Sequence, residues 1–310
     1  MDGSAIDWVS ERVLRALAHD EPIEPAALQL LLTRYVATGR DDLRDAIGPA
    51  LSHAIATCVA EGSLPDAGPT FRSGDATPGR NGAFDRRAGW LMVFVEAAAI
   101  SDDERLDEAI ETLVESLRRK WPSSGEVWQA MQSIEACLSA SQRLAEAQAL
   151  VQAAVDELER VVGVTYEPGE GLLSSLQPGS NEPGRLRDHV AAASALLNAY
   201  AIVGRLPYSM LAEELIQHAR RSWWDAGRGG FWGETPPDAF FWNCQAARVL
   251  CRLAALHEDP EYRAVAVIAH QSDYAADATR TLESLDSLYR ERGHQAAIYG
   301  VALGEWLAMR

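Results

Sequence analysis

The sequence has little that would place the protein in a membrane or outside the cell. Across 310 residues, no apolar run approaches the roughly 20 residues that a helix needs to cross a bilayer. Residues 1–25 contain no basic stretch followed by an apolar one, which is the pattern of a secretory signal. We therefore expect a protein that stays in the cytoplasm.

Cysteine is scarce, and its positions argue against disulfides. The four cysteines fall within expected helices and form no C-x-x-C motif: Cys58, Cys137, Cys244 and Cys251. Cys244 and Cys251 share a helical face, but their separation places them about 10 Å apart along the axis, too far for a disulfide. We interpret all four as buried thiols and expect neither a metal nor a cofactor.

Basic residues are in short supply. The 28 Lys and Arg against 45 Asp and Glu give a formal net charge of -17. Such a field repels nucleic-acid backbones and anionic lipids, so neither is an expected partner. Acidic outer helices that keep the protein in solution are the favoured source of this charge, with a basic substrate or partner as the alternative.

What the chain does contain is a helical hairpin at residues 187–233. The first helix is almost entirely Ala, Leu, Val and Ser, which suits a helix packed on most of its surface. Gly204 supplies its stop, and Pro207 sits where a first-turn proline is tolerated. The second helix alternates apolar and charged residues at helical spacing. The pattern predicts an inner helix followed by an outer one.

Weaker copies of this hairpin recur along the chain, with turns near Gly39, Ser101, Ala140, Gly204 and His257. A sixth inner helix at residues 294–309 ends the sequence, so its outer partner must come from elsewhere. The helix at residues 5–18 is unpaired and can fill that place. We predict an all-α, single-domain (α/α)6 toroid over residues 1–310, closed by the N-terminal helix against the C-terminal one.

Long connections rich in Gly and Pro should gather at one end of this ring. They run from each outer helix to the next inner one, at residues 63–85, 163–186, 225–239 and part of 271–293. Irregular loops on one face of a rigid scaffold commonly carry the functional site. The inner helices also begin there, with unpaired N–H groups that favour anionic or hydroxyl-rich ligands.

Residues 188–233 and 242–270 carry a resemblance to a known family. The matching features are Asp188 and His189, the motif Gly229-Gly230-Phe231, and Asn243 at the start of the next inner helix. They resemble the (α/α)6 domain of the thioredoxin-domain-containing, spermatogenesis-associated-like family. That domain is similar in fold to the N-acylglucosamine 2-epimerase and cellobiose epimerase group. The thioredoxin-like domain is missing here, and His189 stands where the family has a tyrosine.

The resemblance implies a catalytic pair of histidines. His189 and His294 each begin an inner helix, in the fourth and sixth hairpins, as the two catalytic histidines of the sugar epimerases do. Removing a proton beside a carbonyl and returning it to the other face needs two groups of near-neutral pKa. We expect His189 and His294, with Asp188, to point towards the centre of the ring, although both histidines also fit a purely structural role at a helix start.

Two other groups at the same end are candidates. The carboxylates Asp85, Glu126 and Asp188 begin inner helices and would suit glycoside hydrolysis, but carboxylates are also favoured electrostatically at helix N-termini. Aromatic and polar side chains there could stack on and bond to a sugar, or simply fill the neck of the ring. The expected substrate-binding residues are Trp90, Trp128, Gln129, Arg187, Phe231, Trp232, Trp242, Asn243 and Tyr299.

The segment Asp41 to Asp45 matches the metal-binding DDxxD motif of terpene synthases. The same position in the second and fifth hairpins is also acidic, so we interpret these residues as caps and first-turn charges of outer helices. The loop arginines, Arg86, Arg87, Arg185 and Arg187, could bind a substrate anion but are more simply solvated.

These observations favour a carbohydrate-active protein that transfers a proton at a sugar carbon. The alternatives are a non-catalytic toroid that binds a protein partner through its loop face, and a glycoside hydrolase. An open polar cavity lined by both histidines would support the enzyme. A neck plugged by Trp90, Trp128 and Trp242 would support the scaffold.

Overall fold

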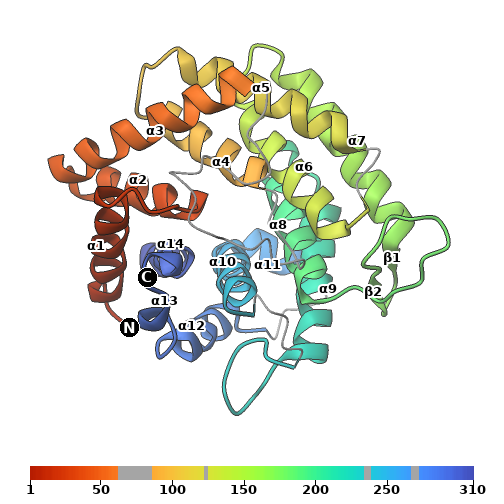
Figure 1. The fold of residues 1–310 in the computed structure, drawn as a ribbon. Helices are drawn as coiled ribbons and strands as arrows, with labels where there is room; N and C mark the ends of the chain where they lie inside the picture. The colour runs from red at the N-terminus through yellow and green to blue at the C-terminus, as the bar shows by residue number, and fades with distance from the viewer. Residues whose placement is uncertain (62–85, 122–124, 234–238, 267–271) are drawn as a thin grey trace.

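The structure is a computed structural model that describes residues 1–61, 86–121, 125–233, 239–266 and 272–310 (Figure 1). Six inner helices form a closed ring in which each contacts the next and the last contacts the first. They are α2 (Pro25–Thr38), α4 (Arg86–Ala98), α6 (Val127–Ser141), α8 (Leu186–Val203), α10 (Ala239–Glu258) and α14 (Ala297–Ala308).

Six outer helices each pack mainly on one inner helix. They are α1 (Ser4–Ala18), α3 (Asp41–Glu61), α5 (Arg105–Lys120), α7 (Ala147–Thr165), α9 (Leu206–Trp223) and α12 (Tyr274–Leu285). Helix α1 packs on α14, and both chain ends lie at this place in Figure 1. The all-α toroid, and its closure by the N-terminal helix, are thereby confirmed.

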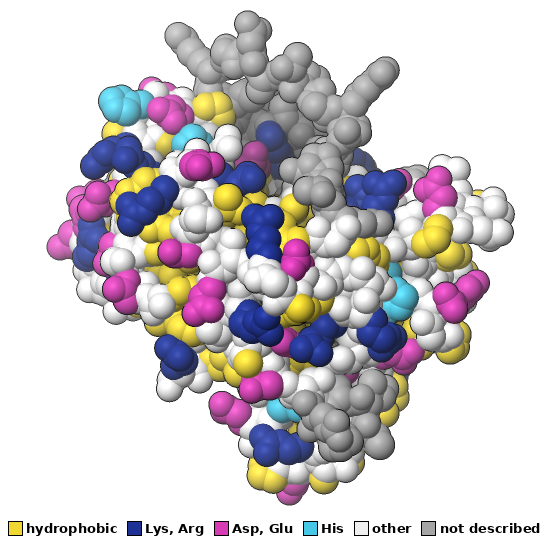
Figure 2. Space-filling view, turned by 90° about the horizontal axis from the view of Figure 1, so that it is seen from below, with side chains coloured by type: hydrophobic (Ala, Val, Ile, Leu, Met, Phe, Trp, Pro, Cys, Tyr) yellow, Lys and Arg dark blue, Asp and Glu magenta, His cyan; other side chains and the backbone are white. Residues whose placement is uncertain are grey.

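The inner and outer helices differ in how they bury their residues. In α8, small side chains such as Ala191, Ala192 and Ala193 are buried around most of the helix. In the amphipathic α5, a single stripe that includes Leu106, Ile110 and Leu113 is buried while the rest of the helix is charged. On the face drawn in Figure 2, acidic and basic side chains are mixed rather than gathered into one patch.

The connections follow the expected polarity. Gly39 and Gly204 adopt the left-handed conformation at the ends of α2 and α8, which makes these inner-to-outer turns short. The return connections are longer. One contains a short antiparallel hairpin of two-residue strands, β1 (Tyr166–Glu167) and β2 (Gly171–Leu172). Another contains α13 (Tyr289–Arg292) and the 3₁₀ helix η2 (Gly293–Ala296), so α14 begins three residues later than the sixth inner helix was expected to.

The fifth hairpin differs from the expected pattern. The helix that follows the turn near His257 is the short α11 (Pro260–Val265), and the outer position is completed by α12. None of the helices in the described ranges is both long and apolar enough to cross a membrane.

Ring closure brings Gly300 of α14 close to Leu30 of α2. A Cβ there would lie 2.9 Å from Cδ1 of the buried Leu30 on α2, whereas a Cβ at Gly304 would have its nearest neighbour at 3.9 Å. We predict that Gly300→Ala lowers the free energy of unfolding. The overpacked side chain costs about 1–3 kcal/mol, which outweighs the roughly 1 kcal/mol that alanine gains in helix propensity. Gly304→Ala should leave stability unchanged or raise it. Urea denaturation of the two variants measures this, and equal effects would contradict the proposed closeness of α14 to α2.

Candidate functional site

A cavity of about 310 Å³ lies where the N-terminal ends of the six inner helices meet. Its wall takes residues from every inner helix and from the segments just before α2 and α14. The cavity is therefore a product of the closed ring rather than of any one hairpin. Its volume lies at the small end of the range for ligand sites.

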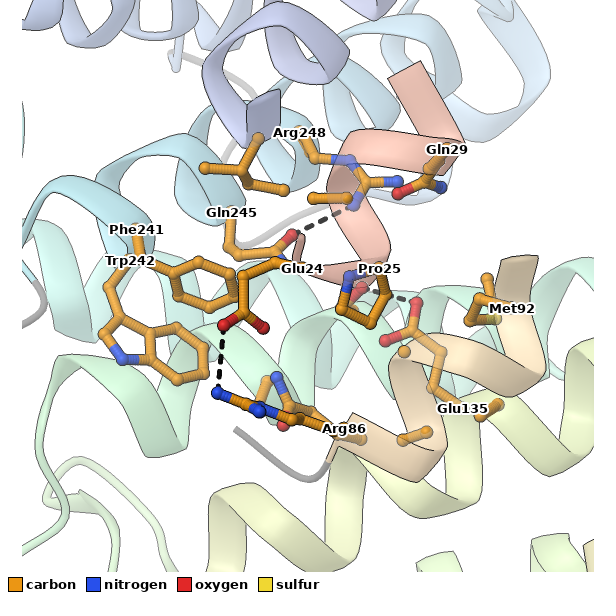
Figure 3. A pocket seen from close by; sticks show the side chains of 18 of the residues that line it. Glu24, Pro25, Gln29, Arg86, Met92, Glu135, Phe241, Trp242, Gln245 and Arg248 are labelled. Atoms are coloured by element: carbon orange, nitrogen blue, oxygen red, sulfur yellow. Dashed lines mark hydrogen bonds and ion pairs between the residues drawn. The ribbon is translucent and has the colours of Figure 1, made fainter. Parts of the chain in front are cut away.

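Aromatic side chains form one part of the wall. Trp128 of α6 and Trp242 of α10 meet edge to face, with ring centroids 5.9 Å apart. Phe241 packs against Trp242 at 5.1 Å, and Figure 3 shows both side chains beside the cavity. Trp128 and Trp242, two of the expected binding residues, therefore line the cavity without filling it.

Helix α6 brings a row of polar groups to the same wall. Trp128, Gln132 and Glu135 lie four and three residues apart, hence on one helical face, and all three line the cavity. The indole Nε1 of Trp128 and Oε1 of Gln132 are buried without a hydrogen-bond partner. An unpaired buried polar atom costs about 1–3 kcal/mol. This wall therefore has one donor and one acceptor that would gain from a hydrogen bond to a ligand.

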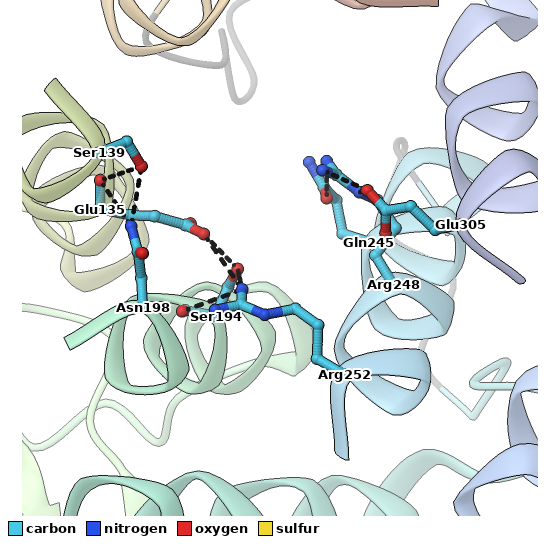
Figure 4. A network of polar contacts seen from close by, with 8 residues as sticks. All are labelled: Glu135, Ser139, Ser194, Asn198, Gln245, Arg248, Arg252 and Glu305. Carbon is cyan, nitrogen blue, oxygen red and sulfur yellow. Dashed lines mark hydrogen bonds and ion pairs between the residues drawn. The ribbon is translucent and has the colours of Figure 1, made fainter. Parts of the chain in front are cut away.

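Glu135 is held through only one of its carboxylate oxygens. Oε1 accepts a hydrogen bond from the Ser194 hydroxyl at 2.6 Å and lies 3.4 Å from Nη1 of Arg252 (Figure 4). The described chain offers no hydrogen-bond donor to Oε2, and this oxygen is not among the buried unpaired atoms. Glu135 thus presents an anchored carboxylate with one oxygen open to the cavity.

Another arginine of α10, Arg248, lines the cavity itself. Arg248 places Nε 2.8 Å from Oε1 of Glu305 on α14, and its Nη1 donates to the Gln245 side chain at 3.1 Å. Burial alone would lower the pKa of Arg248, but Glu305 and the nearby Glu135 outweigh it and raise the pKa. Arg248 is therefore a permanent cation that is already paired.

The mouth of the cavity carries another ion pair. Glu24, just before α2, lies 3.1 Å from the Arg86 guanidinium at the start of α4 (Figure 3). Deeper in the wall, the Gln29 amide donates to Glu96 at 2.6 Å, and burial raises the pKa of Glu96. The cavity is open, and its wall combines apolar and polar groups.

Sequence reasoning missed most of these polar residues: Glu24, Gln29, Gln132, Glu135, Ser194 and Arg248. A usable signal existed. Each lies on or beside a helix whose remaining residues are mainly small and apolar, and several recur at three- or four-residue spacing. A polar stripe along an inner helix of a ring can only face the axis or a neighbouring helix.

His189 does not face the cavity. Its ring stacks on His218 of α9 with centroids 4.7 Å apart and meets Trp223 edge-on at 5.1 Å. Nδ1 bonds to the Arg185 carbonyl at 2.9 Å, and Nε2 accepts from the Leu172 N–H at 3.1 Å. A carbonyl can only accept, so the imidazole is neutral with its proton on Nδ1. The expectation that His189 points to the centre of the ring is wrong, because the Arg185 carbonyl at the start of α8 and the Leu172 N–H of β2 occupy its two nitrogens.

His294 lies elsewhere again. It belongs to η2, and its Nδ1 is 3.4 Å from Glu21 in the segment between α1 and α2. Neither histidine is among the residues that line the described cavity. The facing pair expected from the sequence is therefore absent there.

Asp188 joins two helix starts instead of facing the cavity. Oδ2 accepts from the Arg185 N–H at 2.8 Å and Oδ1 from the Trp128 N–H at 3.3 Å. Burial raises the pKa of Asp188 to about 7. Arg187 pairs with Glu126 at 2.6 Å and lies over the Trp128 ring at 5.4 Å, so it covers the outside of the cavity wall.

The remaining expected binding residues pack loops and helices. The Asn243 amide bonds to both backbone groups of Phe231, at 2.7 and 3.0 Å, and so fixes the glycine-aromatic loop. Trp232 lies under Arg228. The buried Tyr299 ring stacks on Tyr289 at 5.0 Å. Trp90 is buried, Gln129 is half-buried, and neither is part of the described cavity lining.

Other candidates fall outside the site. Asp41 and Asp42 are first-turn residues of α3 and form ion pairs with neighbouring arginines, and Asp45 lies in the same helix. No three His, Cys, Asp or Glu side chains in the described part of the chain are grouped as a metal site requires. Arg185 precedes α8, and the buried Arg87 contacts Ser116 at 3.4 Å. Asp85 lies outside the described residues.

Comparison with known proteins establishes the fold. Neither a protein-family model nor a curated protein matches the sequence. An unsaturated glucuronyl hydrolase from Streptococcus agalactiae is similar in structure, with a TM-score of 0.69 and 10% identity over 100% of this chain and 93% of the hydrolase. The GH76A α-1,6-mannanase from Salegentibacter sp. HEL1_6 gives 0.66 and 11%, over 99% and 98% of the two chains. A D-mannose isomerase gives 0.59 and 14%, over 85% and 86%.

At these identities the likeness is one of fold, and the neighbours are sugar-processing enzymes on (α/α)6 toroids. They include hydrolases and an isomerase, so they do not distinguish between carboxylate and histidine chemistry. The two particular families named from the sequence stay predictions.

The contacts of His189 predict a pH-dependent stability. Burial lowers its pKa from 6.5 to about 4, so between these values the unfolded chain binds more protons than the folded one. The stability that this imidazole contributes is complete above pH 6.5 and is lost as the pH falls, by about 2 kcal/mol at pH 5. His189→Gln should therefore be less stable than the wild type at pH 7, with a difference that shrinks towards pH 5. Urea denaturation at several pH values measures this, and a constant difference would contradict a neutral, buried His189.

Proposed function

We propose that this chain is a carbohydrate-active protein whose central cavity binds a sugar or a sugar derivative. The observation that carries the proposal is the pairing, in one cavity, of aromatic faces with hydrogen-bonding groups that the protein itself leaves unused. The sugar-processing enzymes that share the fold give it independent support.

The aromatic groups suit the apolar faces of a sugar ring. Trp128 of α6 lies beside Trp242 of α10, and Phe241 packs against Trp242, so the three rings lie together. A rigid aromatic surface beside a few convergent polar groups is the usual composition of a small-molecule site. A ligand ring placed there would cover apolar carbon on one side and keep its hydroxyl groups directed at the polar wall.

The polar wall suits hydroxyl groups because a hydroxyl both donates and accepts. Trp128 has an unpaired donor, Gln132 an unpaired acceptor, and Glu135 an oxygen open to the cavity. The first two atoms are nearly covered, so a ligand reaches them only when those side chains turn towards it. A polyol is the ligand class that satisfies all three with one kind of functional group.

For chemistry, we assign the central role to Glu135. It is a carboxylate in the cavity wall with one oxygen anchored and the other open. An ionised carboxylate can withdraw a proton from a sugar carbon or act at the anomeric centre, so it serves both the isomerase and the hydrolase alternatives. Proton transfer by His189 and His294 has less support, because neither ring is in the cavity lining.

A non-catalytic sugar-binding subunit is the second candidate. The observation that favours it is that both carboxylates of the cavity wall, Glu24 and Glu135, are already ion-paired with arginines. The cavity also meets only part of the expectation for an enzyme, since it is open and partly polar but carries no histidine among its described residues. Product formation by a bound sugar decides between the two.

We predict that Glu135→Gln weakens sugar binding at least about tenfold, because it removes charge-assisted hydrogen bonds worth about 1.5–3 kcal/mol. A thermal-shift screen over mono- and disaccharides, followed by calorimetry on any ligand that raises the melting temperature, measures binding. Product analysis with the same sugars measures turnover.

His294→Ala is the comparison variant, and Glu159→Gln, which alters an exposed ion pair with Arg205, is the control. Both should bind as the wild type does. Loss of binding in His294→Ala, with Glu135→Gln unaffected, would contradict a site at Glu135 and favour one at the histidines. If no sugar raises the melting temperature, the carbohydrate proposal fails.

A further inference from the structure

Arg248 occupies the place where an anionic ligand would be held. It lines the cavity, its side chain is 22% exposed, and a guanidinium group is the preferred partner of carboxylate and phosphate groups. A cavity built for a charged sugar would leave the donors of such an arginine free. Here they are used within the protein.

Two of the three guanidinium nitrogens of Arg248 bond to Glu305. Nε and Nη2 both lie 2.8 Å from Oε1 of Glu305, and Nη1 donates to Gln245 at 3.1 Å (Figure 4). Glu305 comes from α14 and is not itself among the residues that line the cavity. The donors of Arg248 are thus directed to a partner outside the lining.

The other cations of the site are paired in the same way. Arg252 approaches Glu135 at 3.4 Å and Ser194 at 3.1 Å, and Arg86 approaches Glu24 at 3.1 Å. The charged groups at the cavity are the described side chains that line it and those that bond to a side chain of the lining. They comprise four carboxylates and three guanidinium groups. These are Glu24, Glu96, Glu135 and Glu305 against Arg86, Arg248 and Arg252.

We infer that Glu305 is a specificity-determining residue that closes the cavity to anionic sugars by holding Arg248 in an ion pair. The inference rests on the proposed function, since it concerns the charge of the sugar that the cavity accepts. A carboxylate or phosphate on the ligand would meet guanidinium groups that are already paired with glutamates, and the open Oε2 of Glu135 in the wall. Like charges brought together at a binding site are a general means of rejecting the wrong ligand. The ligand class is therefore an uncharged sugar.

Matched ligand pairs test the inference. Gluco-, galacto- and manno-configured monosaccharides, and β-1,4- and α-1,6-linked disaccharides, are each compared with the form oxidised to a carboxylate at C6 and with the 6-phosphate. Calorimetry on the wild type should give at least about tenfold tighter binding of the uncharged member, with a dissociation constant that does not depend on salt concentration.

Glu305→Gln should raise the affinity for the anionic member by about tenfold relative to the uncharged one, because it frees Arg248 and removes one negative charge. The double variant Glu305→Gln with Arg248→Gln should lose this gain, which separates a charge effect from a loosened fold. Glu159→Gln removes a carboxylate from an exposed ion pair on the outer helix α7 and should leave the preference unchanged.

The outcomes are distinct. Equal or tighter binding of an anionic sugar by the wild type overturns the role of Glu305 and leaves the sugar site standing. The same holds if Glu305→Gln folds but keeps the wild-type preference. Binding of none of the ligands contradicts the proposed function itself, and this inference with it. The wild-type comparison needs no variant and remains decisive if Glu305→Gln does not fold.

Discussion

Closure of the inner ring between α14 and α2 is the contact on which the rest of the structure depends. Only when these two helices meet do six helix starts surround a common axis, and the cavity has a wall contribution from each. The approach is close because Gly300 places backbone against Leu30. The wall residues come from segments spread from Glu24 to Ile298, so no single hairpin contains enough of them to form a site.

Closure also sets a problem of charge at the centre of the ring. Arginine and glutamate side chains that point to the axis leave bulk water, and each then needs a partner of opposite charge. The chain solves this by pairing across helices, α10 with α14 through Arg248 and Glu305, and α10 with α6 through Arg252 and Glu135. Such pairs add little net stability, but they fix which oxygen and which nitrogen face the cavity.

The architecture could be predicted from the sequence because it depends on patterns that repeat. Small apolar helices alternate with amphipathic ones, and glycine or acidic residues mark each turn, so the number of hairpins and the spare N-terminal helix follow by counting. The location of the site at the inner-helix starts follows from the same polarity. Trp128 and Trp242 were identified on this basis, and both line the cavity.

The direction of individual side chains could not be predicted in the same way. One residue turns a helix by about 100°, so a position at a helix start does not say whether the side chain faces the axis or an outer neighbour. For His189 the outcome is set by the β1–β2 hairpin, where Gly171, with a φ of +86°, comes so close that any side chain would collide with the imidazole. Glu135 and Arg248 were overlooked because a single charged residue in an apolar helix looks like a tolerated exception until its partner on another helix is known.

The packing of α1 on α14 also constrains the order in which the molecule can form. These helices lie at opposite ends of the chain, and the apolar side of α1, including the fully buried Val9 and Val13, has no complete surface to cover it until α14 has been synthesised. During translation, α1 therefore stays partly exposed while the five hairpins between α1 and α14 are synthesised and assemble. Contacts of such long sequence separation slow folding, and unpaired apolar surface invites association with other chains. A ring therefore gains its central cavity at the cost of an interval in which α1 is exposed. An open helical array, which can add one hairpin at a time, has no such interval.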